Sequence, residues 1–222
     1  MKPKVFVSRA IPEAGIALLK KKCQVEVSKK NRVLAKKELI AKVKGKDALL
    51  CLLTDKIDDA VLKTKNLKIV ANYAVGFDNI DIKAATKRKI PITNTPGVLT
   101  DAVADHACTL LLSAGRRIAE SDKFVRAGKY KSWEPMLMLG GDTRGKTLGI
   151  IGSGRIGTAV AERMAKGFGM NVLYYDVKRN PFVEKAAKAT FTSITSLLKR
   201  SDFVSVHVPL LPSTHHLIGT KQ

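Results

Sequence analysis

The chain has 222 residues, 45% of them hydrophobic, which is enough for one large domain or two small ones with a real core. Its 40 basic and 19 acidic side chains give a net charge of +21. The lysines are scattered along the chain, however, and no aromatic residues interleave with them. This distribution argues against nucleic-acid binding as the main function. A positive field does attract anionic substrates and dinucleotides. No apolar run reaches the roughly 18 residues of a membrane-spanning helix, so we expect no membrane partner.

The cysteines are odd in number and widely spaced, at Cys23, Cys51 and Cys108, which fits neither a disulfide framework nor a zinc site. Each lies in an apolar segment, so we expect three buried free thiols in a reducing, cytoplasmic protein. The short apolar stretch at the N-terminus is interrupted by Arg9 and indicates an opening strand rather than a signal peptide.

The first part of the chain alternates short apolar strands with amphipathic helices. We expect strands at residues 4–8, 24–27, 48–53, 68–71 and 90–93, and helices at residues 12–21, 35–43 and 58–63. This β-α-β-α order predicts a parallel sheet with helices on both faces.

Pro96 and Gly97 interrupt this alternation. A long helix is expected to begin near Thr100, with Asp101 in its first turn where a carboxylate suits the helix dipole, and to run unbroken to Gly128. A second strand–helix pattern starts near Lys146. We therefore expect two domains, residues 1–97 and residues 98–222, each an α/β fold with a parallel sheet.

The second domain carries a G-x-G-x-x-G motif made of Gly152, Gly154 and Gly157. It lies between a buried strand at residues 147–151 and a helix at residues 155–166, and a further strand at residues 171–175 ends in Asp176. In such a unit the first glycine permits a tight turn, the second lets the backbone approach a pyrophosphate, and the third lets the helix pack on the strand. The free N–H groups of the helix N-terminus then face the phosphates, and the acid receives the ribose hydroxyls.

Two plainer interpretations stay open for these residues. The glycines could serve only a structural strand-to-helix turn, and Asp176 could be a solvated acid at a strand end. The complete order of strand, glycines, helix, strand and acid favours dinucleotide binding. NAD is the expected cofactor, because Asp176 would repel the 2′-phosphate of NADP, although Lys178 and Arg179 could neutralise that phosphate.

The histidines do not indicate a metal site. His215 and His216 are adjacent and would diverge on a helix or strand, and no acidic cluster accompanies them. His106 falls in the long predicted helix, where we expect it to be packed.

The chain resembles the D-isomer-specific 2-hydroxyacid dehydrogenases over essentially its whole length. Four stretches carry the resemblance: ANYAVGFDNID from Ala71, TNTPG from Thr93 leading into Val103-Ala104-Asp105, GIIGSGRIG from Gly149, and SDFVSVHVPLLPSTHHLI from Ser201. The fold that this resemblance implies is α/β, with two Rossmann-like domains that have parallel sheets. They are a flavodoxin-like substrate domain in residues 1–97 and an NAD(P)-binding Rossmann domain in residues 98–222.

The resemblance also implies residue roles. The backbone N–H groups of Val75 and Gly76 would bind the substrate carboxylate, because backbone donors hold an anion without obstructing the nicotinamide. The positions that match the cofactor-binding residues are Gly152, Gly154, Arg155, Ile156, Gly157, Asp176, Val208, Pro209 and Thr214. His207 matches a position near the cofactor rather than the histidine that transfers the proton.

Within the family, Ser132-Trp133-Glu134-Pro135, Leu139-Gly140 and the segment from Cys51 to Asp55 are similar to the glyoxylate/hydroxypyruvate reductases. That branch implies NAD(P)H-dependent reduction of a small 2-oxo acid, and a homodimer in which the Trp-containing loop helps close the partner's active site. The phosphoglycerate dehydrogenases share the PLLPST stretch and remain an alternative.

The family's catalytic arginine, glutamate and histidine have no counterparts in residues 1–222, so we assign no catalytic residue and expect them beyond Gln222. On this interpretation the Rossmann domain is incomplete at its C-terminus, and the fragment alone is expected to be inactive. A non-catalytic dinucleotide-binding remnant and a corepressor-like interaction protein are the alternatives from other functional classes.

Overall fold

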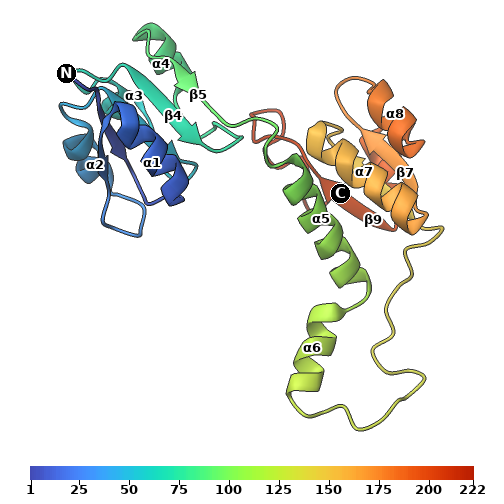
Figure 1. Ribbon diagram of the computed structural model, residues 1–222. Helices are drawn as coiled ribbons and strands as arrows, with labels where there is room; N and C mark the ends of the chain where they lie inside the picture. Colours follow the sequence, from blue (N-terminus) through green and yellow to red (C-terminus); the bar gives the residue numbers. More distant parts are fainter. The chain divides into compact units, whose positions relative to one another are not determined.

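The structure is a computed structural model that describes residues 1–222, and it divides into two compact units, Met1–Gly97 and Val98–Gln222. Figure 1 shows both units as α/β folds, each with its own sheet. No helix combines the length and the apolar character that a bilayer crossing requires.

The first unit alternates strands and helices. Its elements are β1 (Lys4–Val7), α1 (Glu13–Lys22), β2 (Gln24–Val27), α2 (Lys36–Val43), β3 (Ala48–Leu52), α3 (Asp59–Leu62), β4 (Ile69–Tyr73), α4 (Ile82–Lys87) and β5 (Ile92–Thr93). All pairings are parallel, in the order β2-β1-β3-β4-β5. This is the flavodoxin-like strand order, which confirms the predicted parallel architecture.

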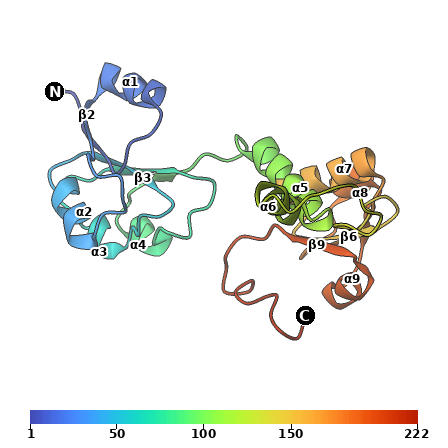
Figure 2. The same ribbon diagram turned by 90° about the horizontal axis from the view of Figure 1, so that it is seen from below.

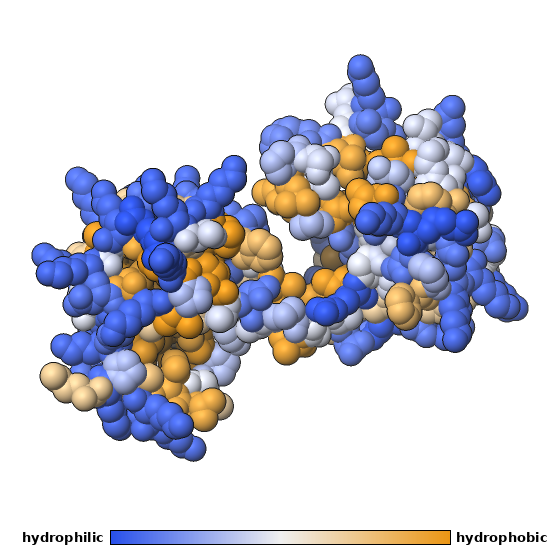
Figure 3. Space-filling model, turned by 90° about the horizontal axis from the view of Figure 1, so that it is seen from above, coloured by the Kyte–Doolittle hydropathy of each residue, from blue (hydrophilic) through white to orange (hydrophobic).

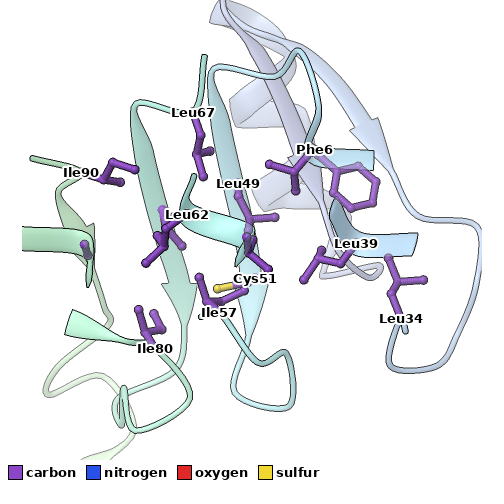
Figure 4. Packing of buried hydrophobic residues seen from close by; sticks show 14 residues of the cluster. Phe6, Leu34, Leu39, Leu49, Cys51, Ile57, Leu62, Leu67, Ile80 and Ile90 are labelled. Carbon is purple, nitrogen blue, oxygen red and sulfur yellow. The ribbon is translucent and has the colours of Figure 1, made fainter. Parts of the chain in front are cut away.

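Successive strand residues supply the two faces of this sheet in turn. Val5 and Val7 pack with Ile16 of α1 on one face, whereas Phe6, between them, joins the larger cluster under α2, α3 and α4. Figure 2 shows α1 on one side of the sheet and the other three helices on the opposite side, and Figure 4 shows the larger cluster closely packed around Leu49. Because both faces are covered, the central strand β3 is apolar throughout.

Most predicted bounds in this unit differ from the observed ones by one or two residues. The sequence pattern predicts no element at residues 82–87, where the structure has α4. The start of this helix has a local cause, since the Asp81 carboxylate accepts a hydrogen bond from the Ala84 N–H at 2.9 Å.

The second unit contains two helices followed by a strand–helix alternation. Its elements are α5 (Thr100–Gly115), α6 (Ile118–Arg126), β6 (Thr147–Ile151), α7 (Arg155–Phe168), β7 (Asn171–Tyr175), α8 (Pro181–Ala187), β8 (Thr190–Phe191), α9 (Ile194–Arg200) and β9 (Phe203–Val206). The sheet is parallel, in the order β8-β7-β6-β9, which is the order of the first four strands of a Rossmann fold. Helices α5, α7 and α8 cover one face and α9 the other (Figure 2).

The prediction of one unbroken helix from Thr100 to Gly128 is wrong. Helix α5 ends at Gly115, Arg117 adopts the left-handed conformation with φ 54°, and α6 starts at Ile118. The Gly115 carbonyl, which a continuing helix would use, instead accepts a hydrogen bond from the Gly141 N–H at 2.8 Å. The break therefore depends on a contact with a distant segment, which local periodicity does not reveal.

Two further expectations need correction. His106 lies in α5 but is exposed rather than packed. Cys51 and Cys108 are buried free thiols as expected, whereas Cys23 is only partly buried. On the face seen in Figure 3, hydrophilic residues alternate with apolar patches.

Candidate functional site

The turn between β6 and α7 contains two glycines that the protein's own packing requires. Gly152 has φ +93°, and a Cβ there would lie 2.8 Å from the His207 carbonyl group. A Cβ on Gly157 would overlap the Gly152 carbonyl oxygen, so only glycine lets α7 approach the turn this closely. These two positions fit the structural roles expected for the first and third glycines of the motif.

Gly154 differs from both. It begins α7 with φ −63°, and a Cβ there would meet no atom within 4 Å, so nothing in the chain itself requires a glycine. The first turn of α7 has no side-chain cap and no acidic residue, which leaves its N–H groups free for an external acceptor. A hollow of about 440 Å³ lies here, lined by Gly154, Arg155 and Thr158 among others. This arrangement suits a phosphate group.

Asp176, at the end of β7, is tied to the same turn. Its Oδ2 accepts hydrogen bonds from the Ser153 N–H at 2.8 Å and from the Ser153 hydroxyl at 2.9 Å, and its Oδ1 accepts one from the Val177 N–H. Each carboxylate oxygen has two lone pairs, so Oδ1 keeps one acceptor site for a hydroxyl of a ribose. The sequence motif reveals Asp176 but not its bonds to Ser153.

Near Asp176 in the sequence, Arg179 belongs to a hydrogen-bonded group of side chains whose other members the sequence motif does not indicate. Arg179 donates to Glu184 through Nε at 3.1 Å and through Nη2 at 3.2 Å, and the Tyr174 hydroxyl donates to the same carboxylate at 2.7 Å. These hydrogen bonds, from Arg179 first and then from Tyr174, lower the pKa of Glu184, and burial raises the pKa of Tyr174. Asn180 connects the group to the glycine turn, since its amide donates to the Ser153 carbonyl.

The residues that follow β9 lie against the other side of the glycine turn. The His207 N–H donates to the Ile151 carbonyl at 2.7 Å, and the His207 ring lies 2.8 Å from the Ser205 hydroxyl. Burial lowers the pKa of His207. The Val208 side chain would lie 2.9 Å from a Cβ on Gly152. The fold thus brings Gly152, Asp176 and Val208 together at the carboxyl ends of three adjacent parallel strands.

Two further residues of the predicted cofactor set, Pro209 and Thr214, lie in the segment that follows β9. The Thr214 hydroxyl accepts from the Leu211 N–H at 2.8 Å and donates to the Pro209 carbonyl. In the structure the Thr214 hydroxyl therefore stabilises the turn in which it lies.

The predicted carboxylate-binding residues, Val75 and Gly76, form a turn after β4 in the first unit. The Asn94 amide donates to the Val75 carbonyl at 2.9 Å, and the Asn72 amide donates to the Gly76 carbonyl at 2.8 Å. The N–H groups of Val75 and Gly76 have no partner within the chain. Both carbonyls are thus held by side chains while both N–H donors stay available. The sequence motifs do not indicate this role of the two asparagines.

The buried side of this turn is a polar network. Asn72, which is 2% exposed, also pairs with Asn79, and the Asn79 amide donates to the Leu52 and Asp55 carbonyls at 3.2 and 3.0 Å. The Asp55 carboxylate accepts from the Ser8 hydroxyl and from the Leu52 N–H. The turn is therefore anchored to the ends of β1 and β3 as well as β4.

The remaining histidines do not form a site. The rings of His215 and His216 lie 3.8 Å apart instead of diverging, because they occupy a turn in which His216 has φ 55°. No group of three or more histidine, cysteine or acidic side chains is arranged to hold a metal ion. A larger hollow of about 680 Å³, lined by Lys166, Lys185, Lys188 and Arg200, lies at the opposite end of the second sheet from the glycine turn.

Comparison with known proteins gives a consistent result. Residues 108–222 match the model of the D-isomer specific 2-hydroxyacid dehydrogenase NAD-binding domain. The chain is 53% identical to a glyoxylate reductase from Korarchaeum cryptofilum over its whole length, and it covers 67% of that protein.

Two solved structures agree in fold. A protein from Thermus thermophilus superposes with a TM-score of 0.90 at 42% identity, covering 96% of this chain and 67% of its own. A D-lactate dehydrogenase from Aquifex aeolicus, solved with NAD and lactic acid, superposes with a TM-score of 0.82 at 29% identity, covering 98% of this chain and 64% of its own. The chain thus spans about two thirds of the length of these relatives.

Proposed function

Since the chain belongs to the D-isomer-specific 2-hydroxyacid dehydrogenase family, we propose that it takes part in reversible hydride transfer between NAD(H) and a small 2-oxo acid such as glyoxylate or hydroxypyruvate. The observation that carries the proposal is Gly154, a glycine that no contact inside the chain requires, at the uncapped start of α7. A bound pyrophosphate would supply the missing steric reason.

In this proposal each group of residues has a separate task. The residues that hold the cofactor are Gly152, Gly154, Arg155, Ile156, Gly157, Asp176, Val208, Pro209 and Thr214. The nicotinamide cofactor supplies or accepts the hydride. The free N–H groups of Val75 and Gly76 hold the substrate carboxylate, and Asn94 and Asn72 keep the two carbonyls turned away from it.

We assign no proton donor within residues 1–222. His106 is exposed on α5, the His207 ring is engaged with Ser205, and His215 and His216 pack on each other. Residues 1–222 alone are therefore proposed to reduce no 2-oxo acid. Following NADH oxidation with glyoxylate and hydroxypyruvate tests this, and steady turnover by the purified chain would contradict it.

Substitution of Gly154 tests cofactor binding. We expect Gly154→Val to abolish NADH binding, because the added methyl groups would occupy the space of the pyrophosphate, while the fold stays intact in the open space around this position. Fluorescence titration with NADH measures binding, and circular dichroism on heating checks the fold. Gly167→Ala, also at a position without neighbours and in the same helix, is the matched control. Unchanged NADH affinity in Gly154→Val would refute the proposed cofactor site.

We also propose that the second unit forms a homodimer. Apolar side chains are exposed along α5 and α6, including Leu110, Ile118 and Val125, and the segment between α6 and β6 exposes 78% of Trp133 and 77% of Met136. Figure 1 shows this segment extending from α6 without regular structure. Such a surface suits an interface between subunits. Sedimentation velocity tests the proposal, and a monomer at micromolar concentration would contradict it.

A further inference from the structure

The end of β7 carries an ion pair that bears on cofactor choice. The guanidinium of Arg179 binds the Glu184 carboxylate through two nitrogens, Nε and Nη2, at 3.1 and 3.2 Å. Glu184 has a second anchor, the hydroxyl of the fully buried Tyr174 at 2.7 Å, and that hydroxyl in turn accepts from the Asn180 N–H at 2.8 Å. The acid of the pair is therefore fixed to the sheet, and it holds the more exposed arginine.

The position of this ion pair, just after β7, bears on the choice between NAD and NADP. NAD and NADP differ only in the 2′-phosphate of the adenosine ribose, which is received where the second strand of the nucleotide-binding unit ends. Here that place holds Asp176, followed within three residues by Lys178 and Arg179. A planar guanidinium is well suited to bind a phosphate through two hydrogen bonds. Arg179 would be such a donor if it were free.

We propose that Glu184 is a determinant of cofactor specificity, which favours NAD(H) by engaging Arg179 and cancelling its charge where a 2′-phosphate would bind. This inference rests on the proposed function, in that the second unit must bind a dinucleotide. Glu184 acts through Arg179 and needs no contact with the cofactor. Lys178, the other basic residue at this place, has no ion pair in the structure.

The test is the substitution Glu184→Gln in the chain of residues 1–222. Glutamine keeps the shape and an acceptor for Tyr174 but gives up the charge that holds Arg179. Because an exposed ion pair contributes little, we expect the Kd for NADPH to fall about two- to fivefold, while the Kd for NADH changes less than this. Calorimetric titration with 2′,5′-ADP and 5′-ADP isolates the same difference in the adenosine half alone.

A double-mutant cycle separates release of Arg179 from simple removal of a negative charge. Arg179→Ala alone should not strengthen NADPH binding, since it removes an arginine that is already engaged and leaves the Glu184 charge uncancelled. In the Glu184→Gln background the same substitution should abolish the gain. Glu13→Gln, in the first unit, makes the same change in net charge at a distant exposed position and should have no effect.

The outcomes distinguish a failure of the proposed function from a failure of the role proposed for Glu184. If the unaltered chain binds neither dinucleotide, the proposed function fails and the inference fails with it. If the unaltered chain binds NADH but Glu184→Gln leaves the NADH-to-NADPH preference unchanged, only the role of Glu184 is overturned. The role is also overturned if the gain for NADPH persists in the double variant, because the arginine would then not be its source.

Discussion

The glycine turn of the second unit and the Val75–Gly76 turn of the first both follow parallel strands and both present free backbone N–H groups, but they do so by different means. In the glycine turn, a helix end supplies the donors, and Gly152 and Gly157 give the room. In the Val75–Gly76 turn, two asparagine side chains hold the carbonyls and so leave the donors free. The first arrangement is visible in a local motif, whereas the second depends on partners from elsewhere in the chain.

The largest effect should come from the glycine turn. We expect Gly157→Ala to destabilise the second unit by about 3 kcal/mol, because its Cβ would overlap the Gly152 carbonyl oxygen, which belongs to the rigid backbone. Urea unfolding followed by circular dichroism measures this. Gly154→Ala, three residues earlier in the same turn, adds the same atom in open space and is the control. Equal stability of the two variants would mean that a Cβ fits at both positions, and would contradict the steric requirement for glycine at position 157.

A smaller effect is expected in the first unit. Asn72→Ala should cost about 2 kcal/mol, because it removes a buried amide and leaves the Gly76 carbonyl without its donor. Hydrogen exchange should also rise in residues 74–78 as the turn loosens. Asn94→Ala, which removes the less buried of the two amides, should lower stability by about 1 kcal/mol. If neither variant changes exchange in residues 74–78, the asparagines do not hold this turn.

The two turns also show how far the sequence predicts the molecule. Periodicity placed the five strands of the first unit together with β6 and β7 of the second, because buried strands are mostly apolar and are separated by turn residues, but it did not place β8 or β9. The glycine motif located Gly152, Gly154, Gly157 and Asp176 at the carboxyl ends of β6 and β7. The roles that we propose for these residues await the binding measurements described above.

What the sequence could not reveal depends on contacts between distant residues. The break after Gly115 requires the N–H of Gly141, and the anchoring of Gly76 requires Asn72 to turn back from β4. The engagement of Arg179 by Glu184 depends on how α8 packs against β7, so the sequence analysis left Arg179 open as a phosphate donor. In each case the residue types are ordinary, and only their partners in the fold give them a function.

The smallest expected effect is a pH dependence confined to one of the two units. All four histidines lie in the second unit, and burial lowers the pKa of His207 below its ordinary value of 6.5. The unfolded chain therefore binds a proton at this histidine at a higher pH than the folded chain does. Stability from the neutral ring is fully present above about pH 6.5 and falls as the pH drops from there toward the lowered pKa.

Urea unfolding of the chain at pH 7.5 and at pH 5.5 tests this expectation. The transition of the second unit should move to lower urea at pH 5.5, while that of the first unit, which has no histidine, should stay in place and serve as an internal control. His207→Gln keeps a polar side chain near Ser205 but cannot gain the proton, so it should remove most of the shift. A shift that persists in His207→Gln would assign the pH dependence to another group. A shift of equal size in both units would show that it does not arise from the histidines.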